Sequence, residues 1–117
     1  MISKELLSEI FMYKVTQIHN IDAENNIHFN GGNEARYPYF LIKPITINIY
    51  ELANKCKEWA FKQGYELFSR ILSNDHQPVG NCVVYRVEAD PEESLCITNA
   101  DTEPEAIFKA CEWVIKQ

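Results

Sequence analysis

Apolar residues near the start of the chain recur at three- and four-residue steps. In KELLSEIFMYKV they form one stripe, and Ser3 precedes it at the position of a helix cap. Ile2 and Leu7 stand where a hydrophobic staple would be. The pattern predicts an amphipathic first helix that begins after Ser3.

The periodicity is lost between Thr16 and Thr46. This segment contains Asn-Asn, Gly-Gly and two prolines, which are residues that favour turns. It therefore predicts a long irregular segment over 16–46, with at most a short strand near 27–29 or 40–42.

A second helical pattern runs from Asn48 to Gln63. Asn48 and Glu51 have the spacing of a capping box, and Gly64 suits the left-handed residue that ends a helix. The apolar residues between them recur at helical spacing. A second helix over these residues is the expectation.

After Gly64 the sequence becomes rich in β-branched and aromatic residues. YELFSRILS and NCVVYRVEA flank the turn segment NDHQPVG, and SLCIT follows a second turn at DPEE. These stretches predict three antiparallel strands, although residues 66–72 also fit a helical pattern.

The last helix begins in TEPE, where Thr102 can cap the chain and Pro104 lies in the first turn. The predicted fold is α+β, with a three-stranded antiparallel sheet and flanking helices in the order α-loop-α-β-β-β-α. The length of 117 residues fits a single domain over 1–117. The edges of so small a sheet need covering, by segment 16–46 or by a second subunit in a homo-oligomer.

Composition and charge exclude several classes of function. The net charge of -6 repels a nucleic acid backbone, so no nucleic acid partner is expected. No signal peptide pattern or membrane-spanning stretch is found in the sequence, which predicts a cytoplasmic protein without a membrane partner. The four cysteines form no CxxC pair and are expected to be reduced and apolar.

The C-terminal stretch ITNADTEPEAIFKACEWVIKQ resembles a signature of small phage and prophage proteins with an α-β-α sandwich domain. In that family a strand leads into a small-Asp-Thr-x-Pro turn and a final amphipathic helix. The likeness covers residues 47–117 and leaves 16–46 unaligned. It implies a phage origin, the cytoplasm of a bacterial host and the fold, but no established activity.

Candidate chemistry is sparse. Asp75 and His76 are adjacent in a predicted turn, and a solvated turn explains them better than a catalytic dyad. NGGN at 30–33 lacks the strand and helix of a phosphate loop and is interpreted as a flexible turn. Four further residues match no metal-ligand spacing: His19, Asp22, Glu24 and His28. No catalytic residue, metal or cofactor is therefore expected.

Two groups of side chains are candidates for binding. Arg70 and Arg86 would lie near one another if the hairpin pairs symmetrically, although charge pairing with neighbouring glutamates is the more economical interpretation. The segment from 36 to 43 combines aromatic and basic residues of the kind found at interface cores. Its candidate binding residues are Arg36, Tyr37, Tyr39, Phe40 and Lys43.

Three hypotheses for function follow. The first is a non-enzymatic phage or prophage accessory protein that binds another protein, with a host factor as one candidate. The second is a small-ligand binder, in which Tyr37, Tyr39 or Phe40 stacks on a nucleotide and Arg36 or Lys43 holds phosphate. A hydrolase that uses His76 ranks last.

Overall fold

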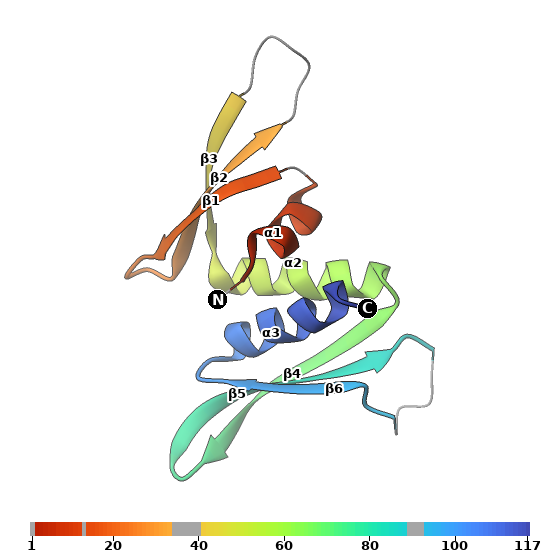
Figure 1. Ribbon diagram of the computed structural model, residues 1–117. Helices are drawn as coiled ribbons and strands as arrows, with labels where there is room; N and C mark the ends of the chain where they lie inside the picture. The colour runs from red at the N-terminus through yellow and green to blue at the C-terminus, as the bar shows by residue number, and fades with distance from the viewer. Residues whose placement is uncertain (1, 13, 34–40, 89–92) are drawn as a thin grey trace. The chain divides into compact units, whose positions relative to one another are not determined.

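The structure is a computed structural model that describes residues 2–12, 14–33, 41–88 and 93–117. Helices and strands follow the order α-β-β-β-α-β-β-β-α, which confirms the predicted α+β class. Two antiparallel sheets of three strands are present among these residues (Figure 1).

The chain divides into two compact units. The N-terminal unit comprises residues 3–52, and the C-terminal unit comprises residues 1–2 and 53–117. The division falls inside a helix, between Leu52 and Ala53. A single domain over 1–117 stays a prediction.

The N-terminal unit contains α1 (Lys4–Phe11) and three strands in the order β1-β2-β3. As predicted, the Ser3 side chain caps α1, accepting a hydrogen bond from the Leu6 N–H at 3.1 Å. The rings of Phe11 and Phe29 lie 5.2 Å apart between centroids, so α1 packs on the sheet. The strands are β1 (Lys14–Ile21), β2 (Asn26–Asn33) and β3 (Leu41–Asn48).

The prediction of an irregular segment over 16–46 is therefore wrong for residues 16–21, 26–33 and 41–46, whereas residues 22–25 form the turn between β1 and β2. β2 pairs with β3 along its whole length and places Ile27 opposite Ile47 and Phe29 opposite Ile45. Both Ile27 and Phe29 are buried. The NGGN sequence continues β2 and is not a turn. Burial and cross-strand pairing here outweigh the low strand propensity of Asn and Gly.

The C-terminal unit contains β4 (Tyr65–Asn74), β5 (Gln77–Arg86), β6 (Cys96–Ala100) and α3 (Glu103–Ile115). α2 (Ile49–Lys62) crosses from one unit to the other and is followed by Gly64, whose φ of 93° is the left-handed conformation expected there. The strands confirm the predicted hairpin and third strand, and β4 rules out the helical alternative for residues 66–72.

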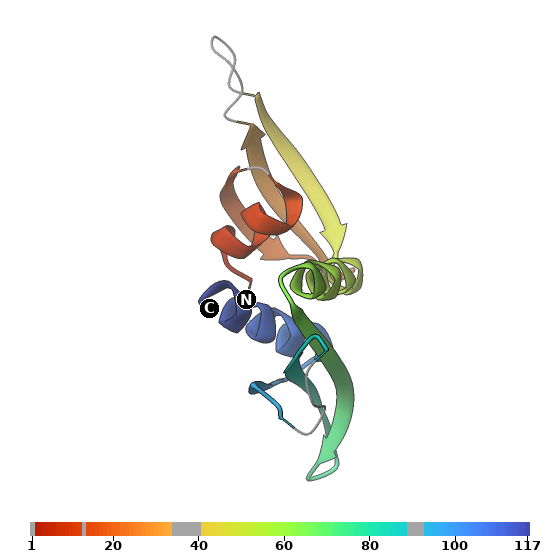
Figure 2. The ribbon, with the colours of Figure 1, turned by 90° about the vertical axis from the view of Figure 1, so that its right-hand side faces the viewer.

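The β4–β5 hairpin closes through a two-residue turn, seen at the green-to-teal tip in Figure 2. Asn74 and Gln77 are the last paired residues, and Asp75 and His76 between them have φ values of 49° and 67°. Two consecutive positive φ values define a type I′ turn, whose twist matches that of the flanking strands. This confirms the turn interpretation of the segment.

α3 packs on one face of the β4-β5-β6 sheet. Thr98 Oγ1 donates to the Ala106 carbonyl at 2.6 Å, and Ser69 Oγ donates to Glu103 at 2.6 Å. Gly80 approaches the start of α3 so closely that a Cβ there would overlap the Thr102 carbonyl. These contacts place the odd positions of β4 and the even positions of β5 and β6 under α3.

The four cysteines are free thiols. Cys56, Cys82 and Cys111 are buried, and the Cys111 thiol donates to the Cys56 carbonyl at 3.5 Å between α3 and α2. Burial raises the pKa of Cys82 to about 12, and the hydrogen bond with Cys56 together with burial raises the pKa of Cys111. None of the described helices has the length and apolar character to cross a lipid bilayer.

Candidate functional site

Most of the predicted binding segment lies outside the described residues: Arg36, Tyr37, Tyr39 and Phe40. Lys43 lies in β3 opposite Gly31, and its side chain also lies outside the described part of the structure. The assignment of these residues to a binding surface stays a prediction.

Arg70 and Arg86 do not come together. The register places Arg70 opposite Asn81 and Arg86 opposite Tyr65, so they are five positions apart along the hairpin and on opposite faces of the sheet. The Arg86 guanidinium instead lies over the Tyr65 ring, 5.7 Å from its centroid. The idea of a shared anion site is therefore wrong.

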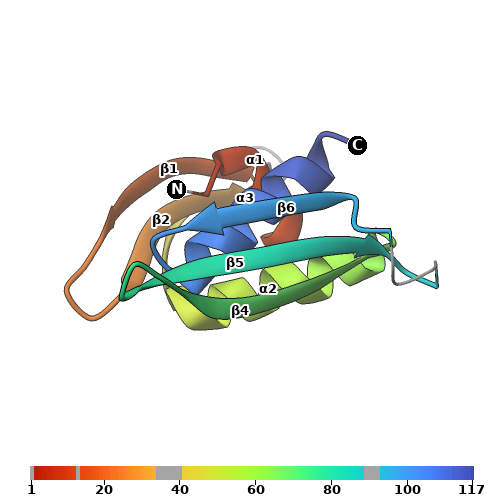
Figure 3. The ribbon, with the colours of Figure 1, turned by 90° about the horizontal axis from the view of Figure 1, so that it is seen from below.

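The face of the β4-β5-β6 sheet that points away from α3 is called here the open face. Figure 3 looks onto it, with α2 and α3 behind the strands. One row across the three strands consists of Phe68, Val83 and Ile97. The Phe68 and Ile97 side chains are 54% and 59% exposed. Within this unit the open face thus displays an apolar row to solvent.

Aromatic and aliphatic side chains extend this row. The Tyr85 ring meets the Phe68 ring edge-on, with centroids 5.5 Å apart. Leu95, just before β6, is also exposed, and its N–H donates to the Val84 carbonyl at 2.8 Å. The cluster of Phe68, Val83, Tyr85, Leu95 and Ile97 is called here the apolar patch.

A polar row borders the apolar patch. Arg70 Nε donates to Asn81 Oδ1 at 3.3 Å, and Asn81 Nδ2 donates to Asn99 Oδ1 at 3.1 Å. Asn81 is buried, and both ends of its amide have partners. The chain of hydrogen bonds across the strands therefore fixes these side chains in place beside the apolar patch.

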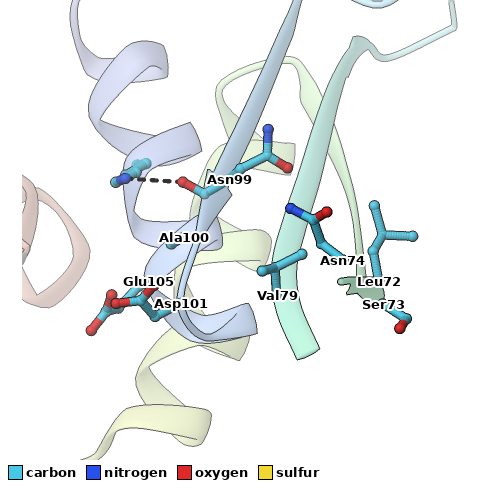
Figure 4. A pocket seen from close by; sticks show the side chains of 9 residues that line it. Leu72, Ser73, Asn74, Val79, Asn99, Ala100, Asp101 and Glu105 are labelled. Carbon is cyan, nitrogen blue, oxygen red and sulfur yellow. Dashed lines mark hydrogen bonds between the residues drawn. The ribbon is translucent and has the colours of Figure 1, made fainter. Parts of the chain in front are cut away.

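A hollow of about 650 Å³ lies next to the polar row, toward the hairpin turn (Figure 4). Asp101 and Glu105 lie together near the start of α3, and Lys109 Nζ donates to the Asn99 carbonyl at 2.9 Å. Leu72, Asn74 and Val79 line the opposite side. Two carboxylates against one ammonium group make the hollow unsuited to a phosphate.

In the N-terminal unit, one histidine is held between a carboxylate and a hydroxyl group. His28 Nε2 lies 2.7 Å from Asp22 Oδ2, and His28 Nδ1 lies 2.9 Å from Thr46 Oγ1. The neutral tautomer with its proton on Nε2 donates to Asp22 and accepts from Thr46. Asp22 Oδ1 also accepts the N–H groups of Glu24 and Asn26.

These bonds lower the pKa of Asp22, the Asn26 N–H having the largest effect and the His28 hydrogen bond the next. A carboxylate, an imidazole and a hydroxyl group hydrogen-bonded in this order can transfer a proton from the hydroxyl group to the imidazole. The His28 and Asp22 side chains are 41% and 31% exposed, however, so water competes for each group. We interpret this cluster as a structural contact that holds the turn between β1 and β2 against β3.

From the sequence, Asp22 and His28 are candidates only as metal ligands. Among residues 2–12, 14–33, 41–88 and 93–117, no three His, Cys, Asp or Glu side chains gather as a metal centre requires. The sequence gives no reason to select Thr46. Its position opposite His28 depends on the β2–β3 register, which the pattern of apolar and polar residues does not reveal.

Comparison of the chain with protein-family models, with curated protein sequences and with solved structures gives no significant match. The candidate sites above therefore rest on geometry and chemistry alone.

Proposed function

We propose that the chain is a phage or prophage accessory protein that acts by binding another protein and not by catalysis. The observation that carries the binding role is the apolar patch on the open face. Exposed clusters of apolar side chains with polar residues at their border are typical of protein interaction sites. The resemblance of residues 47–117 to phage proteins supports the phage context, the cytoplasm of a bacterial host and a host protein as one candidate partner.

The chemistry of the surface indicates what the partner should offer. Phe68 and Tyr85 are large aromatic side chains of types enriched at protein interfaces, and tyrosine is also enriched among the residues that dominate binding energy. The net charge of -6 favours a partner with basic residues around its own apolar contact surface. We therefore propose a basic protein that places apolar side chains on the row of Phe68, Val83 and Ile97.

The test is capture of partner proteins from bacterial lysate with a tagged chain and with the double variant Phe68→Ser, Ile97→Ser. Both side chains are exposed, so the fold should survive the change while the captured protein is lost. Phe61→Ser is the matched control, because Phe61 is 55% exposed and lies on α2, not on the β4-β5-β6 sheet. Equal capture by the double variant and the unmodified chain would refute this use of the open face.

The segment 36–43 gives a separate test of the function predicted from sequence. Replacement of Tyr37 and Tyr39 by Ser should abolish capture with unchanged circular dichroism if the segment carries the binding surface. The nucleotide-binding alternative predicts a higher melting temperature in the presence of nucleotides. The acidic hollow lends that alternative no support.

A further inference from the structure

β4 is one edge of the β4-β5-β6 sheet. The Gly64 carbonyl accepts the Val87 N–H at 2.9 Å, immediately before β4, so the even residues of β4 bond to β5. The odd residues direct their N–H and C=O groups away from β5. In the described part of the C-terminal unit, no backbone group hydrogen-bonds to these outward groups.

The other edge strands of the two sheets carry features that discourage pairing. β1 is interrupted by register shifts, and β6 is only 5 residues long. β3 contains Pro44, at an even position; the Ile49 N–H bonds to the Asn25 carbonyl, so odd residues of β3 face β2 and Pro44 faces outward. Each of these edges is thereby protected from a further strand.

β4 has no such protection. Its 10 residues pair with β5 in one unbroken register, without a bulge, and its sequence YELFSRILSN contains neither proline nor lysine. Ile71, on this edge strand, is 64% exposed. A long, regular edge of this kind is a template for another strand.

The residues around the centre of β4 are complementary to themselves. Glu66 and Arg70 lie two positions before and after Phe68, and all three side chains are on the open face. When a strand pairs antiparallel with its own copy about Phe68, each Glu66 comes opposite Arg70 of the other copy. Opposite charges at paired positions stabilise a sheet, and like charges there destabilise it.

We propose that β4 pairs with β4 of a second copy of this chain, antiparallel about a two-fold axis at Phe68, to join the two sheets into one. Leu67 and Ser69 then exchange backbone hydrogen bonds with Ser69 and Leu67 of the second copy, because odd residues carry the outward groups. Phe68 faces Phe68 of the second copy in the closer, non-hydrogen-bonded kind of pair. The two apolar patches become neighbours on one continuous surface.

The experiment measures mass by sedimentation velocity on the full chain and on the variants Glu66→Arg and Arg70→Glu. The unmodified chain should sediment with twice the monomer mass of 13.6 kDa. Each variant alone places like charges at both positions and should raise the dissociation constant about tenfold or more. Mixed in equal amounts, the two variants should restore the dimer, because every pair then again joins opposite charges.

Two further variants separate pairing from folding. Arg86→Glu changes an arginine of the same sheet away from the edge and should leave the dimer intact. Ile71→Pro removes an outward N–H without removing a bond to β5 and should give a folded monomer by circular dichroism. A chain that is monomeric at concentrations up to about 1 mM, or single variants that fail to restore the dimer when mixed, would overturn the proposal.

The pairing does not require the open face to bind another protein. A monomeric chain that still captures a partner through Phe68 and Ile97 would overturn the pairing and leave the proposed function in place. A dimer whose apolar patch captures no partner would overturn the proposed function and leave the β4 pairing in place.

Discussion

At the scale of single residues, the conformations of a few side chains set local stability. His76 has a φ of 67° in the hairpin turn, a conformation that costs a residue with a side chain about 1–2 kcal/mol and costs glycine little. Asp75, with a φ of 49°, is of a residue type that tolerates this region more readily. Glycine at position 76 would therefore adopt this turn conformation at a lower conformational cost than histidine.

We predict that His76→Gly stabilises the chain by about 1 kcal/mol, because glycine is the preferred residue at the second position of a type I′ turn. Denaturant unfolding would measure the gain. Asp75→Gly serves as the control and should give a smaller change. A loss of stability in His76→Gly would show that the imidazole makes a contact of its own.

We predict that Asp22 makes the free energy of unfolding depend on pH under acidic conditions. Its pKa is lowered from the ordinary value of 3.8 by the Asn26 N–H first and by His28 next. The unfolded chain therefore takes up a proton more readily, so this contribution is complete above the ordinary pKa and is lost as the pH falls through the folded value. Asp22→Asn should lose less stability than the unmodified chain between pH of about 5 and about 3. Far-ultraviolet circular dichroism during denaturation is the measurement, and identical pH profiles would contradict the assignment.

At the scale of helices and strands, the sequence predicts the elements whose local signals agree with their packing. Ser3, Asn48 and Thr102 cap helices as expected, and the Thr102 side chain accepts the Glu105 N–H at 3.3 Å. The β4–β5 hairpin and β6 are predicted because runs of β-branched residues there are flanked by residues that favour turns.

The strands of the N-terminal unit escape prediction for a physical reason. β2 includes Asn30, Gly31, Gly32 and Asn33, and it is a strand because its neighbours on both sides pair with it. Nor does the sequence reveal the open face. Leu67 and Phe68 are both apolar, and only the packing of α3 on the odd side leaves Phe68 exposed and Leu67 buried.

The packing of α3 gives a prediction at this scale. Gly80→Ala should destabilise the C-terminal unit by about 3 kcal/mol, because the added methyl group overlaps backbone atoms of Thr102 and Glu103 that cannot rotate away. Gly64→Ala is the matched comparison: it meets no atom within 4 Å but keeps a φ of 93°, so it should cost about 1 kcal/mol. Thermal unfolding measures both, and equal costs would mean that α3 shifts freely on the sheet.

At the scale of the whole molecule, the reactivity of the four thiols measures how readily the C-terminal unit opens. Cys96 is partly exposed, whereas Cys56, Cys82 and Cys111 are buried. With a pKa of about 12, Cys82 is a thiolate in about one molecule in ten thousand at pH of about 8. Cys96 should therefore react with iodoacetamide first, and the other three should react only as the unit opens. Mass spectrometry of digested samples measures the order, and equal rates at all four would contradict the buried positions.

The division of the chain into two units has a consequence for anyone who follows its folding by optical methods. Both tryptophans, Trp59 and Trp113, belong to residues 53–117, and so do all four cysteines. Residues 3–52 therefore contain no tryptophan of their own, and the ring contact between Phe11 and Phe29 lies in this unit. A tryptophan in place of Phe29, followed beside the two natural ones, would show whether the β1-β2-β3 sheet melts together with the rest or at a temperature of its own.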